Sequence, residues 1–277
     1  TPSRNDALVW MARTLIDQDE LSESAGLINT LQYDPNLPLR LRDDLDEVNA
    51  YWFYKQNIFD SAAAHLQKSL SNAESKQDRA RSEFLLAQLY ELTNQFDKAS
   101  LYYSKVSAHT TAPLMDIYAR LNNAKMMKGS NPLELNNSIN KLVKMAKKDK
   151  FETFKDILFY SAGELSLQKK DTLAAISYFA KSFQFNQTNL PLKNKATLQL
   201  ADIAYNQKQY KKAYAYYDSL QLADTSLADR LANIKTKKSA LVKIVEKIII
   251  VEREDSAIRK ISTTLVLKEN ESGFELI

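Results

Sequence analysis

The sequence contains no cysteine and, in 277 residues, only four glycines and six prolines. Without cysteine, disulfides, thiolate metal sites and a cysteine nucleophile are excluded within this segment. Scarce glycine and proline argue against a sandwich or barrel, since the tight turns of sheet-rich folds draw on both residues. No run approaches the ~20 apolar residues that a membrane-spanning helix needs. These absences favour a protein built from long helices.

Sequence motifs for catalysis and cofactor binding are also missing. The chain has no P-loop, no GxGxxG motif and no GxSxG motif. His65 and His109 lack the partner at i+4 that completes a helical zinc pair, so we interpret them as surface or interfacial residues. The acidic run at 43–47 is interpreted as a helix start, because carboxylates favour the positive end of a helix. We therefore predict a protein that is not an enzyme and uses no cofactor or metal.

The net charge of +4 is unevenly distributed. Residues 1–112 carry 11 basic and 16 acidic side chains, whereas residues 113–277 carry 27 basic and 18 acidic ones. The sharpest basic excess lies at 141–150, which holds five lysines. A run of this kind is usually a solvated helix face, so we predict no nucleic-acid partner.

Small residues recur with a period of 37 to 39 residues. The first series is Ala12, Ala50, Ala87, Ala124, Gly163 and Ala201. A second series, 12 to 14 residues later, is Ser24, Ala62, Ala99, Ser138, Ala175 and Ala213. Four residues further comes a large side chain: Ile28, Leu66, Tyr103, Leu142, Phe179 and Tyr217. In the turn between the two series we expect a mostly bulky residue: Leu21, Phe59, Phe96, Leu135, Thr172 and Tyr210.

This double periodicity predicts pairs of antiparallel helices. Where two helices cross closely only a small side chain fits, and the large residue one turn further fills the space beside the crossing. One hairpin cannot bury its apolar face alone, whereas stacked copies can. We therefore predict an all-α, right-handed superhelical solenoid of six hairpins within residues 1–222. Their expected bounds are about 5–35, 43–75, 80–108, 113–148, 152–186 and 193–222.

The sequence changes character after residue 222. Residues 226–261 contain neither glycine nor proline, which predicts a helix within 223–261 that caps the open end of the stack. A β-strand is the alternative for residues 242–251, because they are strongly apolar and rich in β-branched side chains. Residues 262–277 are predicted to form a loose tail or a short hairpin that turns at Ser272-Gly273.

The repeated units resemble tetratricopeptide (TPR) repeats. The family pattern combines small residues in both helices with aromatic residues, and Ala87, Tyr90, Ala99 and Tyr103 match it. The resemblance covers roughly residues 5–222. The period exceeds the 34 residues typical of the family, so helices or connections are longer than usual, and the unit at 113–148 is degenerate. Other helical repeats of similar period, such as Sel1-like units, stay open as an alternative, although they carry more glycine.

Several segments also resemble the SprE/PorW lipoproteins of the Bacteroidetes type IX secretion and gliding-motility machinery. These segments are QDRARSEFLLAQLYELTNQFDKASLYYSKV, PLMDIYARLNNAKM, KATLQLADIAYNQKQYKKAYAYYDSL and LVKIVEKIIIVEREDSAIRKI. The resemblance ends near Ser262. It implies an outer-membrane lipoprotein that faces the periplasm, with its lipid-bearing cysteine upstream of Thr1. It also implies an adaptor role and protein partners in the cell envelope.

In TPR superhelices the first helix of each hairpin lines the concave face. Carried over by position, the candidate partner-binding residues are Arg13, Glu47, Tyr51, Tyr54, Phe84, Gln88, Glu91, Lys125, Lys128, Tyr160, Glu164, Asp202 and Tyr205. Aromatic rings and mixed charges in a groove suit an extended or helical protein segment. The same aromatic residues can instead pack between repeats. The acidic side chains in this set argue against binding of an acidic peptide terminus.

We therefore predict a non-catalytic protein-interaction scaffold, a periplasmic adaptor of type IX secretion. Two rivals stay open. One is a TPR sensor arm of a regulatory protein, in which the C-terminal helix is a signalling linker. The other is a ligand-binding lipoprotein that holds glycans on aromatic side chains.

Overall fold

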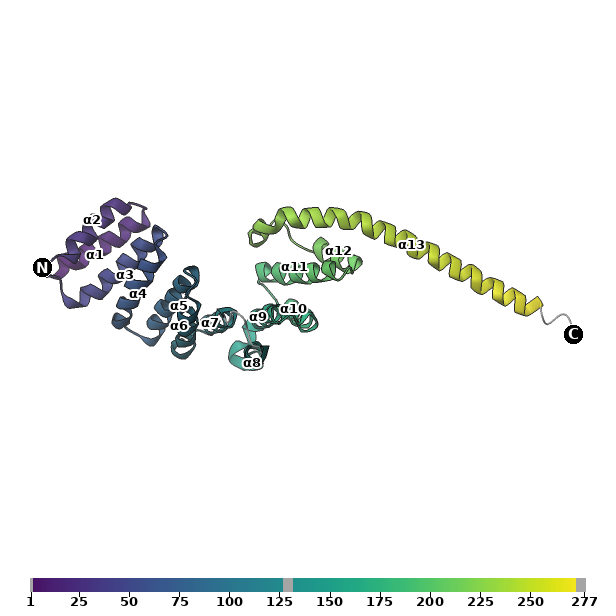
Figure 1. Ribbon diagram of the computed structural model, residues 1–277, viewed down its shortest axis with the longest axis horizontal. Coiled ribbons are helices and arrows are strands. Elements are labelled where there is room, and N and C mark those ends of the chain that lie inside the picture. The colour runs from purple at the N-terminus through teal and green to yellow at the C-terminus, as the bar shows by residue number, and fades with distance from the viewer. Residues whose placement is uncertain (1, 127–131, 273–277) are drawn as a thin grey trace. The chain divides into compact units, whose positions relative to one another are not determined.

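The chain is all-α, as predicted. The computed structural model describes residues 2–126 and 132–272, and every regular element within them is a helix (Figure 1). Two compact units can be distinguished: residues 1–154 with 164–170, and residues 155–163 with 171–277. Each unit is described by itself below.

Eight helices of the first unit form four consecutive pairs. Their bounds are α1 Pro2–Asp17, α2 Leu21–Gln32, α3 Leu39–Lys55, α4 Phe59–Ser69, α5 Lys76–Leu92, α6 Phe96–His109, α7 Pro113–Met126 and α8 Pro132–Met145. Two short 3₁₀ segments, Leu70–Asn72 and Asp149–Phe154, follow α4 and α8. The next helices are α9 Lys155–Gln168, α10 Thr172–Phe185, α11 Leu190–Asn206 and α12 Tyr210–Asp218. A 3₁₀ segment at Thr225–Arg230 then leads into α13, Leu231–Ser272.

The predicted helix crossings are present. Ala12 and Ser24 are both fully buried, and the Ser24 hydroxyl donates a 3.0 Å hydrogen bond to the Ala12 carbonyl oxygen across the α1–α2 crossing. Such a bond is possible only where two helices approach closely, which a small side chain permits. All six residues of the large series are also buried. The periodicity therefore corresponds to hairpin packing.

The turn inside each hairpin has one conformation wherever it is described. Three residues separate the paired helices, and the middle one has positive φ: Asp19, Asn57, Asn94, Lys170 and Lys208. After Asp19, Asn57, Asn94 and Lys208, the amide of the next residue donates a hydrogen bond to the carbonyl oxygen five residues earlier, as from Ile58 N–H to the Phe53 carbonyl oxygen at 3.0 Å. This is a left-handed helix end closed by a 6→1 hydrogen bond.

Several boundary expectations need correction. The bulky residues expected in the turns, such as Leu21, Phe59 and Phe96, are instead the first residues of the second helices. The acidic run at 43–47 is not a helix start, because α3 begins at Leu39. Its carboxylates bond to side chains of neighbouring helices instead, as Asp46 does to His65 Nδ1 at 2.6 Å.

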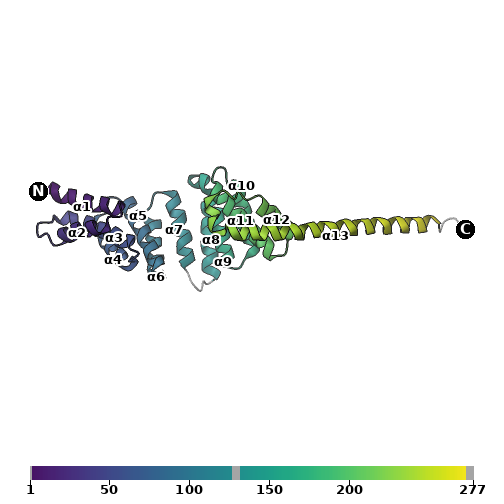
Figure 2. The ribbon, with the colours of Figure 1, turned by 90° about the horizontal axis from the view of Figure 1, so that it is seen from above.

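The end of the chain also differs from expectation. Residues 242–251 are helical, and α13 continues to Ser272, so the hairpin expected after residue 262 is wrong for residues 262–272. With no glycine or proline between Leu231 and Gly273, nothing in the sequence stops the helix, and its continuity outweighs β-branched propensity. Residues 273–277 lie outside the described part. In Figure 1 and Figure 2, the C-terminal half of α13 runs past α11 and α12 with no helix beside it.

Two helical glycines offer a matched stability test. A Cβ on Gly163 would lie 2.6 Å from a ring carbon of the fully buried Phe179, whereas a Cβ on Gly26 would meet nothing within 4 Å. We expect Gly163→Ala to destabilise the protein by about 1–2 kcal/mol through overpacking, and Gly26→Ala to stabilise it by roughly 0.5–1 kcal/mol. Urea unfolding measures both variants, and equal effects would contradict the close α9–α10 packing.

Candidate functional site: an open groove in the first unit

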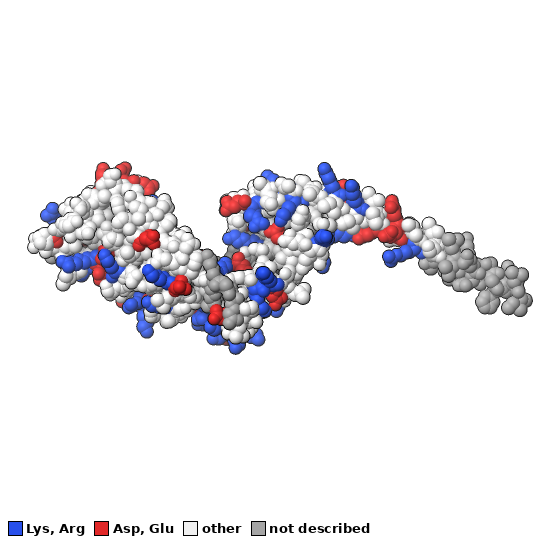
Figure 3. Space-filling view, in the orientation of Figure 1, with Lys and Arg blue, Asp and Glu red and all other residues white. Residues whose placement is uncertain are grey.

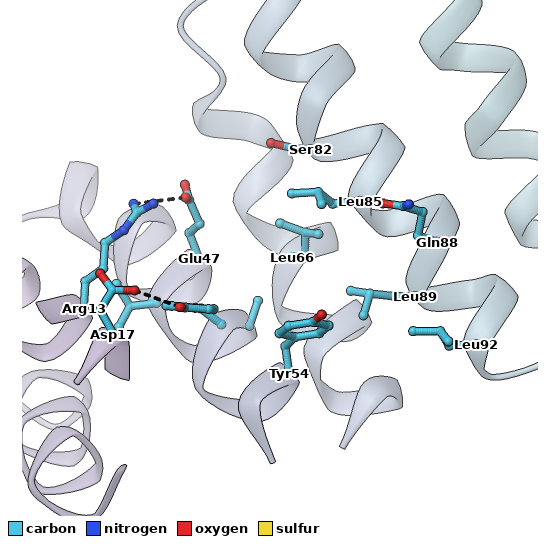
Figure 4. A pocket seen from close by; sticks show the side chains of 13 residues that line it. Arg13, Asp17, Glu47, Tyr54, Leu66, Ser82, Leu85, Gln88, Leu89 and Leu92 are labelled. Atoms are coloured by element: carbon cyan, nitrogen blue, oxygen red, sulfur yellow. Dashed lines mark hydrogen bonds and ion pairs between the residues drawn. The ribbon is translucent and has the colours of Figure 1, made fainter. Parts of the chain in front are cut away.

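A groove of about 500 Å³ runs over the first three hairpins of the chain. We call it the first-unit groove. Figure 4 shows its side chains projecting from neighbouring helices toward a common space. The lining residues are Arg13, Asp17, Glu47, Val48, Ala50, Tyr51, Tyr54, Leu66, Ser82, Leu85, Gln88, Leu89 and Leu92.

Charged groups gather at the α1–α3 side of the first-unit groove. The Arg13 guanidinium lies 3.4 Å from the Glu47 carboxylate, and both side chains are about half exposed. The Tyr51 hydroxyl donates a 2.7 Å hydrogen bond to Asp17, which together with burial raises the pKa of Tyr51. Because exposed ion pairs contribute little to stability, these charges are free to exchange partners.

The α5 side of the groove is mainly apolar, although Ser82 and Gln88 of α5 also line it. Leu89 and Leu66 are buried beneath it, while Tyr54, Leu85 and Leu92 remain 49%, 54% and 55% exposed. Large apolar side chains that stay in water around a concave surface are typical of binding sites. The groove therefore joins a charged end to an apolar end.

The structure brings five of the predicted site residues together in this groove. They are Arg13, Glu47, Tyr51, Tyr54 and Gln88. Phe84 and Glu91 of α5 were also predicted to line the groove, but both side chains contact Tyr103 of α6 instead. Phe84 packs against Tyr103 with ring centroids 5.5 Å apart, and Glu91 accepts a hydrogen bond from the Tyr103 hydroxyl.

The remaining predicted residues do not extend the groove. Lys125 bonds to Glu164 at 3.0 Å, and Lys128 lies outside the described residues. The Tyr160 ring packs on Phe179, with 5.5 Å between the ring centroids, so it contributes to packing inside the protein. Asp202 and Tyr205 belong to a face of α11 that is already covered.

That face of α11 is covered by the start of α13. Ile234 and Leu241 of α13 are fully buried in the same apolar cluster as the last hairpin. Lys237 donates a 2.6 Å hydrogen bond to Asp202 and lies 5.1 Å from the centre of the Tyr205 ring.

Asp202 is the centre of a polar cluster that holds α13 in place. Besides Lys237, its carboxylate accepts hydrogen bonds from the Tyr217 hydroxyl at 2.5 Å and from Arg230 at 2.9 Å. Burial pushes the pKa of Asp202 upward, but the Lys237 and Tyr217 hydrogen bonds outweigh it, so the pKa lies below its ordinary value. Burial and the Asp202 hydrogen bond together raise the pKa of Tyr217.

Sequence reasoning missed the leucines of the apolar end, Leu85 and Leu92, and the acid Asp17. The sequence does indicate exposed leucines here, because residues 84–92 contain more apolar side chains than one buried helix face can hold. Asp17 carries no such signal, since its role depends on the position of Tyr51 in another helix.

The histidines and the metal-ligating side chains of the described residues form no metal centre. No group of three or more His, Asp or Glu side chains there could hold a metal ion. Each histidine pairs with a carboxylate inside a hairpin, as His109 Nδ1 does with the buried Glu83 at 2.7 Å. Among the residues that the structure describes, no helix is long and apolar enough to cross a membrane.

Comparison with known proteins identifies the fold as a TPR-like helical solenoid. The chain aligns with RapI in its apo form at 15% identity and a TM-score of 0.62, over 77% of this chain and 64% of RapI. It therefore spans less than two thirds of RapI's length. No family profile and no curated protein sequence matches.

Two further solved structures are similar. One is the C-terminal part of a TPR repeat-containing protein from Cytophaga hutchinsonii, with 15% identity, a TM-score of 0.57, and 88% of this chain and 89% of that one covered. The other is the apo quorum sensor NprR from B. thuringiensis, with 14% identity, a TM-score of 0.54, and 88% and 70% covered. At these identities the likeness concerns the fold alone.

The Asp202 cluster predicts an acid-sensitive attachment of α13. Because the pKa of Asp202 is lowered on folding, its contribution is present at neutral pH and is lost as pH falls below about 4. We expect Asp202→Asn to weaken amide-exchange protection in residues 231–241 by about 1.5–3 kcal/mol at neutral pH. The difference from wild type should shrink in acid.

The control is Asp229→Asn, which changes an exposed acid with no partner among the described residues. Equal protection in both variants at neutral pH would show that Asp202 does not hold α13.

Proposed function

We propose that the protein is a non-catalytic protein-interaction scaffold that binds a partner segment in the first-unit groove. The single observation that carries this proposal is the apolar end of the groove, where Tyr54, Leu85 and Leu92 are about half exposed above a buried floor. Exposed apolar side chains that gather on one surface mark interaction sites, and tyrosine is among the residues that contribute most to binding at protein interfaces.

The groove favours an amphipathic partner. Its apolar end offers hydrophobic contact, while Arg13, Asp17 and Glu47 offer charges of both signs at the other end. A segment that carries apolar and charged groups in sequence would match both ends. An acidic peptide terminus would meet the carboxylates of Asp17 and Glu47 and is not the partner we propose.

We further propose an adaptor role on the periplasmic side of the outer membrane, within type IX secretion and gliding motility. The support is the resemblance of four sequence segments to the SprE/PorW lipoproteins. A lipid anchor upstream of Thr1 and partners among the envelope components of that machinery belong to the same proposal.

Affinity capture from the solubilised envelope of the source organism tests the scaffold and its location together. The bait is the whole chain, compared with Tyr54→Ala/Leu85→Ala, which removes two exposed groove side chains. We expect the double variant to capture at least about tenfold less of the specific partners, the loss from about 1.4 kcal/mol of binding energy. Mass spectrometry then identifies what the wild type retains.

The control bait is Tyr33→Ala, since Tyr33 is 75% exposed and lies outside the groove. The whole proposal would be supported if wild type and control capture secretion or motility components and the double variant does not. Equal capture by all three baits would contradict the groove. Capture of a kinase or transcription regulator instead would contradict the secretion role and favour the sensor arm.

A further inference from the structure

In the later repeats of the first unit, one face of the first helix meets the hairpin that precedes it. In α3 this face includes Trp52, two residues after the small residue Ala50, and its indole N–H donates a 2.9 Å hydrogen bond to the Leu21 carbonyl oxygen of α2. In α7 it includes Asn123, one residue before the small residue, and its amide donates a 2.9 Å hydrogen bond to the Ser104 hydroxyl of α6. We call this side the leading face of a first helix.

Apolar residues on the leading face are buried by this packing. Leu86 and Leu89 hold the same two positions in α5, and both are buried in one apolar cluster with residues of α4. A third leading-face position lies five residues before the small residue, because residues three and four apart share one side of a helix. It is buried in α3, α7, α9 and α11, where it is Leu45, Ala119, Leu158 and Ala196.

The leading face of α1 is exposed instead. Ala7, Met11 and Thr14 hold its three positions, and all three are exposed. Met11 is 51% exposed, whereas Leu86 at the same position of α5 is fully buried. Trp10, which lies beside Met11 on this side of the helix, is 66% exposed. Two large apolar side chains therefore stay in water where the later repeats bury theirs.

This face of α1 is not built like the outer face of a terminal repeat. A repeat array needs a polar outer face at its ends to stay soluble. The four residues of the α1 leading face, 7, 10, 11 and 14, are uncharged, and the surface over α1 and α2 is mostly uncharged in the view of Figure 3. Exposed apolar side chains that gather on one surface mark an interaction site.

The later repeats show what fits on a leading face, namely the second helix of a preceding hairpin. A second copy of the chain has no free helix of this kind among α2, α4, α6, α10 and α12, because each of these already contacts the helix that follows it. Hairpins of one chain can be joined by short connections, such as the three residues between α6 and α7. A hairpin joined to α1 in this way would be held at a high effective concentration beside its leading face.

We propose that a further TPR-like hairpin precedes Thr1 in the same protein and packs its second helix on the leading face of α1. That helix covers Trp10 and Met11 with apolar side chains, as α4 covers Leu86 and Leu89 of α5. Helix α1 is then an internal first helix of a longer array. The inference is independent of the first-unit groove, because none of the four leading-face residues of α1 lines the groove.

Tryptophan fluorescence tests this contact, because Trp10 and Trp52 are the two tryptophans of the chain. The substitution Trp52→Phe leaves Trp10 as the only reporter. It is made in the chain from Thr1 and in a longer protein that also contains the residues encoded directly before Thr1, about 40 of them, the length of one repeat. We expect iodide to quench Trp10 at least about fivefold less in the longer protein, because a packed helix shields the ring from solvent.

A charge on the leading face provides the control. In the longer protein, Met11→Glu should raise the quenching of Trp10 at least about threefold, because burying an unpaired carboxylate is costly. Tyr33→Glu, at a residue that is 75% exposed outside this face, should leave the quenching unchanged. Because Met11 is exposed in the chain from Thr1, Met11→Glu should leave the circular dichroism of that chain unchanged, which separates a lost contact from a misfolded first hairpin.

Several results would overturn the proposal. One is equal quenching of Trp10 in the two proteins, and another is equal quenching in the two glutamate variants of the longer protein. A third is a lipid-bearing cysteine separated from Thr1 by less chain than one hairpin occupies, such as Leu39–Ser69 of α3 and α4. Protection of Trp10 that rises with concentration in the chain from Thr1 would also overturn it, because the face would then bind a second copy.

Discussion

The close crossing of two helices at paired small residues is the contact on which the rest of the structure depends. At Ala12 and Ser24 the backbones approach closely enough for a side-chain hydroxyl to bond the opposite carbonyl oxygen. This approach brings the large residue one turn later into the core, where Tyr103 and Tyr217 are fully buried. It also fixes which face of each first helix looks outward, and therefore where the first-unit groove can form.

Neighbouring first helices are joined by charged side chains at equivalent positions. Arg13 of α1 pairs with Glu47 of α3, and Asp202 of α11 pairs with Lys237 of α13. In both pairs the first residue directly follows the small residue of its repeat. Asp202 also accepts hydrogen bonds from Tyr217 and Arg230, whereas the Arg13–Glu47 pair stays about half exposed at the charged end of the first-unit groove.

The sequence carries enough information for the hairpins, because small and large side chains at a fixed period reflect local packing. The sequence carries less information about the groove. Asp17, for example, lines it because the side chain bonds to Tyr51, which lies in another helix. A helix that caps the end of the stack is expected from the sequence, but the sequence does not show that Lys237 of this helix contacts Asp202 and Tyr205. The strand alternative over residues 242–251 gave weight to β-branched residues, which a long uninterrupted helix tolerates. The hairpin expected after residue 262 relied on a turn at Ser272-Gly273, but α13 continues to Ser272.

The turns inside the hairpins limit how such a chain can change in evolution. Each described turn has three residues with its middle residue at positive φ, whereas the connections between hairpins of the first unit vary from three residues to more. Adding one residue inside a turn would rotate the second helix by about 100° and carry its small residue away from the crossing. A one-residue insertion in a described turn would therefore disturb the crossing, whereas a change in length between hairpins leaves it intact. The hairpin of α7 and α8, whose small residues Ala124 and Ser138 are 14 residues apart instead of 12, differs from the others by two residues.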